Sequence, residues 1–128
     1  MKLKHMFIIQ AIIALAYAVG ELFIPATLLK MYGLGDNPGA EIILTARLFG
    51  WGLAAVGLIT AFVANAPQSE ARQSIVKALF VAHVVGLIVS LMGVLNGTFN
   101  AVGWSAVIIY LFLAAGFGYF WFIKPEQA

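Results

Sequence analysis

Residues 75–95 read IVKALFVAHVVGLIVSLMGVL, and only Lys77, His83 and Ser90 in this stretch carry polar side chains. An α-helix rises about 1.5 Å per residue, so about 20 apolar residues can cross a hydrocarbon layer about 30 Å thick. The stretch lacks the alternation of a barrel strand, and unpaired backbone groups are costly in lipid. It therefore predicts a transmembrane α-helix.

Similar apolar stretches make up most of the chain, since 63% of its 128 residues are hydrophobic and only 9% are charged. We expect four spans, at residues 6–29, 40–64, 75–95 and 102–123. Pro25 predicts a kink in the first span. Asn37 is the predicted cap of the second span, with Pro38 as its first helical residue. Short loops favour antiparallel neighbours, so the prediction is an all-α, polytopic membrane protein whose single domain (1–128) is an up-down-up-down bundle of four transmembrane helices.

The basic residues between the spans are distributed unevenly over the two predicted membrane sides. One side has only Lys30, whereas the other side has Lys2, Lys4, Arg72, Lys77 and Lys124. The positive-inside rule then predicts a multi-pass protein of the cell (inner) membrane with both termini in the cytoplasm. The net formal charge of +2 is interpreted as an orientation signal, and binding to nucleic acid is not predicted.

The composition excludes several kinds of chemistry. The chain contains no cysteine, which removes disulfides, thiolate catalysis, iron–sulfur clusters and Cys-rich zinc sites. His83 is the single histidine within a predicted span, and one histidine without a cysteine is a poor basis for a metal site. We therefore predict no cofactor, no metal and no catalytic residues.

Glu21 and Arg47 are the ionisable pair within the spans, and such residues are costly in lipid and often mark a site. Counted along the helices, Glu21 in the first span and Arg47 in the second lie at a similar depth. We predict a buried ion pair, because each charge offsets part of the other's desolvation cost. The pair is either a structural salt bridge that fixes helix pairing or part of a ligand, proton or substrate site. In both cases Arg47→Leu alone should be more harmful than Arg47→Leu combined with Glu21→Leu.

Further polar side chains fall on the same predicted inner faces. In the first span, Gln10, Tyr17 and Glu21 form one stripe at i, i+7 and i+11. In the third span, His83 and Ser90 are seven residues apart and share a face. The predicted interior polar site comprises Glu21, Arg47, His83, Tyr17, Ser90, Tyr110 and Gln10.

Two segments resemble a known family. Residues 46–53 (ARLFGWGL) and 82–90 (AHVVGLIVS) are similar to the Arg-x-Phe-Gly and Gly-His patterns of Erg28-type proteins, although Ala82 precedes His83 here. Four short-looped spans with one arginine and one histidine inside also resemble DoxX-like and other small bacterial four-span families. The resemblance implies an accessory or scaffolding membrane subunit that holds partner enzymes together.

Three functions are open at this point. The leading hypothesis is a non-catalytic accessory or scaffold subunit, because small residues along several spans are typical of faces that bind partner helices. One alternative is a small transporter or proton-coupled carrier that uses Glu21, Arg47 and His83. Another is an intramembrane lipid-binding protein or enzyme in which Glu21 and His83 do acid–base work. The expected partners are the lipid bilayer and either other membrane protein subunits or further copies of the chain.

Overall fold

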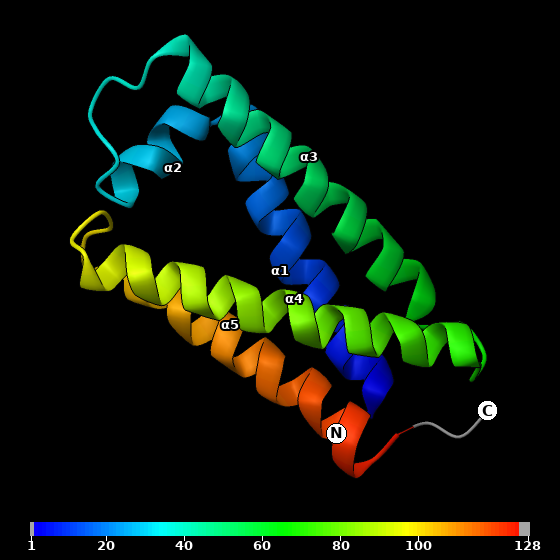
Figure 1. The fold of residues 1–128 in the computed structure, drawn as a ribbon. Coiled ribbons are helices and arrows are strands. Elements are labelled where there is room, and N and C mark those ends of the chain that lie inside the picture. The colour runs from blue at the N-terminus through cyan, green and yellow to red at the C-terminus, as the bar shows by residue number, and fades with distance from the viewer. Residues whose placement is uncertain (1, 126–128) are drawn as a thin grey trace.

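The computed structural model describes residues 2–125, and every regular element among them is a helix (Figure 1). The elements are α1 (Leu3–Phe23), α2 (Pro25–Met31), α3 (Ala40–Val63), α4 (Glu70–Leu95), α5 (Gly103–Gly118) and the π-helix η1 (Tyr119–Ile123). Four stretches are long and apolar enough to cross a membrane: Leu3–Phe23, Ala40–Val63, Glu70–Leu95 and Gly103–Ile123. The predicted all-α class with four apolar membrane-crossing helices is confirmed.

The first predicted span, residues 6–29, is divided into two helices. The chain leaves the helical conformation at Ile24 (φ −132°, ψ 47°), and Pro25 then opens α2. A proline at the first helical position needs no hydrogen bond from its nitrogen, whereas inside a helix it would break one. The predicted kink at Pro25 is confirmed, and the prediction of one continuous helix through residue 29 was wrong.

The helices α3 and α4 begin with different kinds of N-terminal cap. Gly39 is the cap of α3 and is extended (φ −67°, ψ 165°), so Asn37 and Pro38 lie outside the helix and their predicted roles were wrong. Ser69 caps α4, because its side-chain oxygen accepts a hydrogen bond of 3.2 Å from the backbone N–H of Arg72. A side-chain cap fixes the start of α4, whereas the extended conformation at Gly39 fixes that of α3.

Glycines let α1 and α3 pack closely along each other. A Cβ atom built at Gly50 would lie 2.7 Å from the Cβ of Glu21, and one built at Gly57 would lie 2.7 Å from the Cγ of Leu15. The buried residues of α3 are Ala46, Gly50, Gly57 and Thr60. Small side chains at this face allow the close backbone approach that replaces hydrophobic driving force in lipid.

The helices α4 and α5 form a second pair by the same means. Gly86 of α4 lies against the ring of Tyr110 of α5, because a Cβ at Gly86 would come within 2.6 Å of the Cε1 atom of Tyr110. The turn between them contains Gly97 at φ +78°, a conformation that favours glycine. The spans are thus arranged as two helix pairs, α1 with α3 and α4 with α5 (Figure 1).

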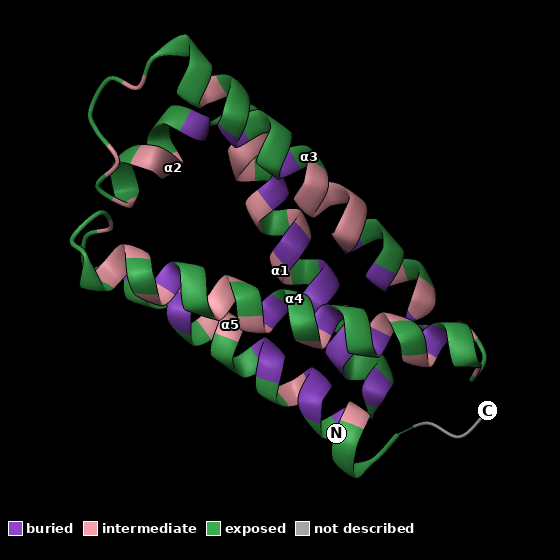
Figure 2. Cartoon of the chain, viewed as in Figure 1, coloured by how far each residue is buried: buried purple, intermediate pink, exposed green. Residues whose placement is uncertain are grey.

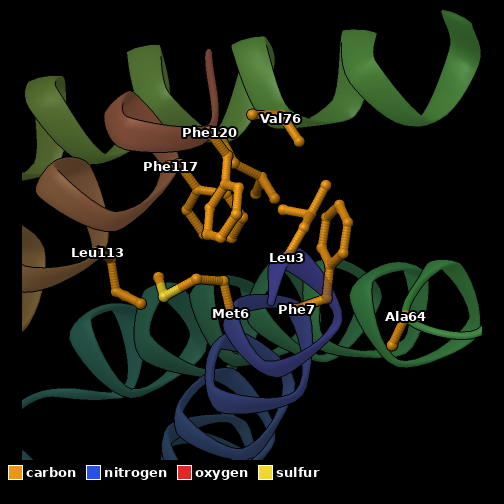
Figure 3. Packing of buried hydrophobic residues seen from close by; sticks show 9 residues of the cluster. Leu3, Met6, Phe7, Ala64, Val76, Leu113, Phe117 and Phe120 are labelled. Carbon is orange, nitrogen blue, oxygen red and sulfur yellow. The ribbon is translucent and has the colours of Figure 1, made fainter. Parts of the chain in front are cut away.

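The two pairs meet at the end where α1 begins. A buried cluster there joins α1 to the other pair and includes Leu3, Met6, Phe7, Ala64, Val76, Leu79, Leu113, Phe117 and Phe120 (Figure 3). Its rings of Phe7 and Phe117 have centroids 5.7 Å apart. This cluster lies at one end of the molecule, whereas small buried side chains such as Ala14, Ala18 and Ala46 continue along α1 and α3.

Hydrogen bonds between loops connect the pairs at the other end. The backbone N–H of Asn100 donates to the carbonyl of Tyr32 at 3.0 Å, and its side-chain amide donates to the carbonyl of Met31 at 2.9 Å. Between the core and these bonds the two pairs diverge (Figure 1). Residues of α1 and α5 are more often buried than those of α3 and α4, which carry exposed residues along their length (Figure 2).

Candidate ligand-binding cleft

A cleft of about 580 Å³ lies between the two helix pairs, and all four spans and α2 contribute to its walls. Six of the seven residues of the predicted polar site line it: Gln10, Tyr17, Glu21, His83, Ser90 and Tyr110. Most of the other lining residues are apolar, among them Ile13, Leu28, Phe49 and Val89. The structure therefore brings these six predicted site residues together around one mostly apolar space.

The cleft opens sideways between α3 and α4. These two helices do not pack along each other, whereas α1 contacts α5. The residues on the two edges of the opening are exposed: Ile42 (49%) and Phe49 (52%) on α3, and Val85 (54%) and Val89 (61%) on α4. Because these apolar edges belong to helices that are long and apolar enough to cross a membrane, we expect the opening to face the hydrocarbon layer.

Three polar atoms of the lining are buried and have no hydrogen-bond partner within residues 2–125. They are Oε1 of Gln10, Oε2 of Glu21 and Nε2 of His83. Gln10 and His83 are almost fully buried, with exposed fractions of 3% and 6%. A buried polar atom without a partner costs about 1–3 kcal/mol, so native proteins rarely keep several of them in one place without a reason.

Aromatic rings hold His83 in position. Its imidazole stacks on Phe117 with ring centroids 5.7 Å apart and an interplanar angle of 23°, and the ring of Tyr110 lies 5.9 Å away. Phe117 belongs to the core, so the position of the imidazole is tied to the contact between the two helix pairs. The side chain of His83 is thereby fixed beside the cleft, as a preorganised binding group has to be.

Hydroxyl groups form a chain across the end of the cleft near α2. The hydroxyls of Tyr17 and Tyr32 are 2.8 Å apart, and that of Tyr32 is 3.3 Å from Oγ of Ser105. Sequence reasoning missed Tyr32 as a site residue, because the break at Pro25 brings it back toward the bundle. The pairing of Tyr17 with Tyr32 was therefore not visible in helical spacing.

Arg47 does not belong to this site, and the predicted ion pair with Glu21 was wrong. Arg47 is exposed, it does not line the cleft, and no carboxylate lies within 4.0 Å of it in the described part of the chain. The buried face of α3 includes Ala46, and one residue further along a helix turns the side chain by about 100°. Gly50 is the residue of α3 that lies against Glu21.

The chemistry available in the cleft is hydrogen bonding at its polar atoms and apolar contact elsewhere. Between Lys2 and Pro125 there is no group of three or more His, Cys, Asp or Glu side chains that could hold a metal ion. The cleft thus offers polar groups on its inner wall and apolar side chains along its sideways opening.

Comparisons of the chain with family models, curated protein sequences and solved structures gave no match. The resemblance to Erg28-type and DoxX-like proteins therefore stays a prediction, and the site is interpreted from its own geometry. What the fold supports directly is a small multi-pass membrane protein with four apolar membrane-crossing helices.

Proposed function

We propose that this small membrane protein binds an amphipathic, lipid-like molecule in the cleft. Gln10 and Glu21 lie about 16 Å apart along α1, so separate polar groups of the molecule, of hydroxyl or amide type, bond to Gln10, Glu21 and His83, and its apolar part lies between α3 and α4. The observation that carries the proposal is that three side chains lining one sideways-open cleft each have a buried polar atom without a hydrogen-bond partner among residues 2–125. A ligand that supplies those hydrogen bonds removes the cost of leaving the atoms unpaired.

The dimensions and chemistry of the cleft support a molecule of this class. A volume of about 580 Å³ lies within the range of small-molecule sites, which are mostly apolar with a few placed polar groups. Because the opening faces lipid, a molecule dissolved in the bilayer reaches the cleft without crossing water. The neighbouring α3 and α4 then act as the two edges of an entrance.

The accessory-subunit and carrier hypotheses have less support from the geometry. Small-residue faces were the reason to expect partner helices, but Gly50, Gly57 and Gly86 already pack against residues of this chain. The carrier hypothesis needed Arg47 beside Glu21 and His83, and Arg47 lies outside the cleft. Both functions stay predictions without a structural observation that favours them.

Co-purification of lipid tests the proposal. The protein is purified in a mild detergent, its bound lipids are extracted, and they are identified by mass spectrometry. We expect one class of amphipathic molecule to be enriched with the wild-type protein. The double variant Gln10→Leu with His83→Leu should retain at most about one tenth of the lipid found with the wild-type protein, since two hydrogen bonds of about 1 kcal/mol each are removed.

Two further variants guard against misfolding and unspecific effects. Ala82→Phe adds a large ring at an exposed position of the cleft lining and should displace the ligand while the core stays intact. Arg47→Gln changes a polar residue within α3 but outside the cleft, and it should retain the ligand. Equal retention by Ala82→Phe and the wild-type protein would contradict the proposal, as would a wild-type protein that enriches no lipid class.

A further inference from the structure

A second cavity, of about 510 Å³, lies at the end of the molecule where α1 begins, and we call it the basic pocket. Four cationic side chains line it: Lys2 and Lys4 at the start of α1, Arg72 of α4, and Lys124 after η1. Asn65 and Gln68 of the α3–α4 loop add polar groups, and no aspartate or glutamate is among its described lining residues. Segments from both helix pairs thus gather positive charge around one space.

Arg72 is the fixed cation of the basic pocket. Its side chain is only 7% exposed, its Nη2 atom donates to the carbonyl of Ala64 at 3.4 Å, and its guanidinium lies 5.4 Å from the centroid of the Phe7 ring. A guanidinium keeps its charge at all ordinary pH values, so Arg72 supplies a fixed positive charge at the wall of the pocket. A positioned arginine with exposed lysines around it is typical of phosphate recognition.

The three lysines carry charge that no acid of the described chain offsets. Lys2, Lys4 and Lys124 are exposed, and none has a carboxylate within 4.0 Å among residues 2–125. Lys30 of α2 does have such a partner, because it forms an ion pair of 3.2 Å with Asp36 in the loop before α3. Like charges around a shared cavity repel one another, so an anion bound there lowers the electrostatic free energy of these three lysines.

We propose that the basic pocket binds the phosphate head group of an anionic phospholipid. The position favours a lipid over a free anion, because the pocket lies at the ends of membrane-crossing helices. Phe122 (64% exposed) and Ile123 (72% exposed) directly precede Lys124 and give acyl chains an apolar surface beside the head group. Basic pockets between transmembrane helices on the cytoplasmic side are suited to anionic head groups, because anionic lipids are concentrated in that leaflet.

The experiment measures lipid binding to the full-length protein in nanodiscs. Wild-type protein is placed in discs of phosphatidylcholine with increasing fractions of phosphatidylglycerol, and the thermal unfolding midpoint is followed. A bound lipid stabilises the folded state by mass action, so the midpoint should rise with the phosphatidylglycerol fraction. Lys124→Gln should require about fivefold more phosphatidylglycerol for the same rise, the factor expected for one lost cation near a head group.

Lys77→Gln is the matched control, since Lys77 is an exposed cation of α4 that does not line the pocket. We expect the phosphatidylglycerol response of this variant to stay within about twofold of the wild-type response. The combined variant Lys2→Gln, Lys4→Gln and Lys124→Gln should lose the response, although Arg72 and the core remain.

Three results would overturn the proposal. They are a wild-type midpoint that does not depend on phosphatidylglycerol, an equal loss of response in Lys77→Gln and Lys124→Gln, and an equal rise when inorganic phosphate is added to phosphatidylcholine discs at matched ionic strength. The last result would assign the pocket to a free anion instead of a lipid.

Discussion

Glu21 shows how one side chain can be placed correctly by sequence reasoning while its partner is placed wrongly. Its Cβ packs against Gly50, its Oε2 atom is buried in the cleft without a partner, and no cation lies within 4.0 Å in the described chain. Helical spacing predicted that Glu21, Tyr17 and Gln10 share a face, and all three line the cleft. The assignment of Arg47 failed because depth along a helix says nothing about rotation around it.

The corrected geometry predicts that Glu21 and Arg47 act independently. A true ion pair makes the double change Glu21→Leu with Arg47→Leu less harmful than the two single changes together. Without a direct contact, the effects on the free energy of unfolding should add to within about 0.5 kcal/mol. Unfolding of the four proteins in detergent micelles measures this coupling, and a coupling above about 1 kcal/mol would show that the two groups do interact.

At the scale of single helices, the sequence predicted which segments cross the membrane but not how they turn. The number of apolar residues fixes a span, because each residue adds about 1.5 Å of length. Both sides of such a helix are apolar in lipid, so polarity does not select the inner face. In α3 the small residues Ala46, Gly50 and Gly57 select it. This series of small residues was the sequence signal from which the outward position of Arg47 could have been predicted.

Two glycines of α3 provide a paired test of this explanation. A methyl group at Gly50 would meet the Cβ of Glu21 at 2.7 Å and the backbone of Leu22 at 3.2 Å, whereas at Gly52 nothing lies within 4 Å. Gly50→Ala should therefore destabilise the protein by about 1–3 kcal/mol. Gly52→Ala should be neutral or stabilising by up to about 1 kcal/mol, because alanine restricts the unfolded chain.

Thermal unfolding in detergent, followed by circular dichroism, separates the two variants. If Gly50→Ala melts at or above the wild-type temperature, α1 and α3 are not held together by close approach at Gly50. A loss of stability in Gly52→Ala would instead show that an open face of α3 is packed against something else.

For the whole molecule, the arrangement of the two helix pairs could not be predicted from four spans and short loops. The pairs meet in one aromatic core around Phe7, Phe117 and Phe120 and then diverge. Which spans pair closely depends on glycines that fit particular partners, and where the pairs separate depends on the placement of the large rings. Hydropathy contains neither piece of information, so the cleft and the basic pocket became visible only in three dimensions.

Phe117 is the residue through which this arrangement can be tested. It is fully buried, and its ring lies 5.7 Å from both Phe7 and His83. Phe117→Ala should lower the free energy of unfolding by about 3 kcal/mol or more, because removal of the ring leaves a cavity where the two helix pairs meet. Phe117→Ala should also lower the affinity for the cleft ligand, since the imidazole of His83 loses the ring on which it stacks.

Phe112→Ala is the matched control, because Phe112 lies on the same helix but is 46% exposed. Removal of the Phe112 ring should change the unfolding midpoint little, since lipid takes the place of the ring. Equal midpoints for the two variants would mean that the aromatic core does not hold the helix pairs together.

The break before Pro25 has a consequence for how much of the chain is needed to cross the bilayer. The 21 residues of α1 already rise about 31 Å, which matches the hydrocarbon thickness. The seven residues of α2 are therefore not needed for the crossing, and Leu28 and Leu29 line the cleft instead. A lipid-like ligand of the kind proposed would then enter the cleft through the opening between α3 and α4 and not past α2.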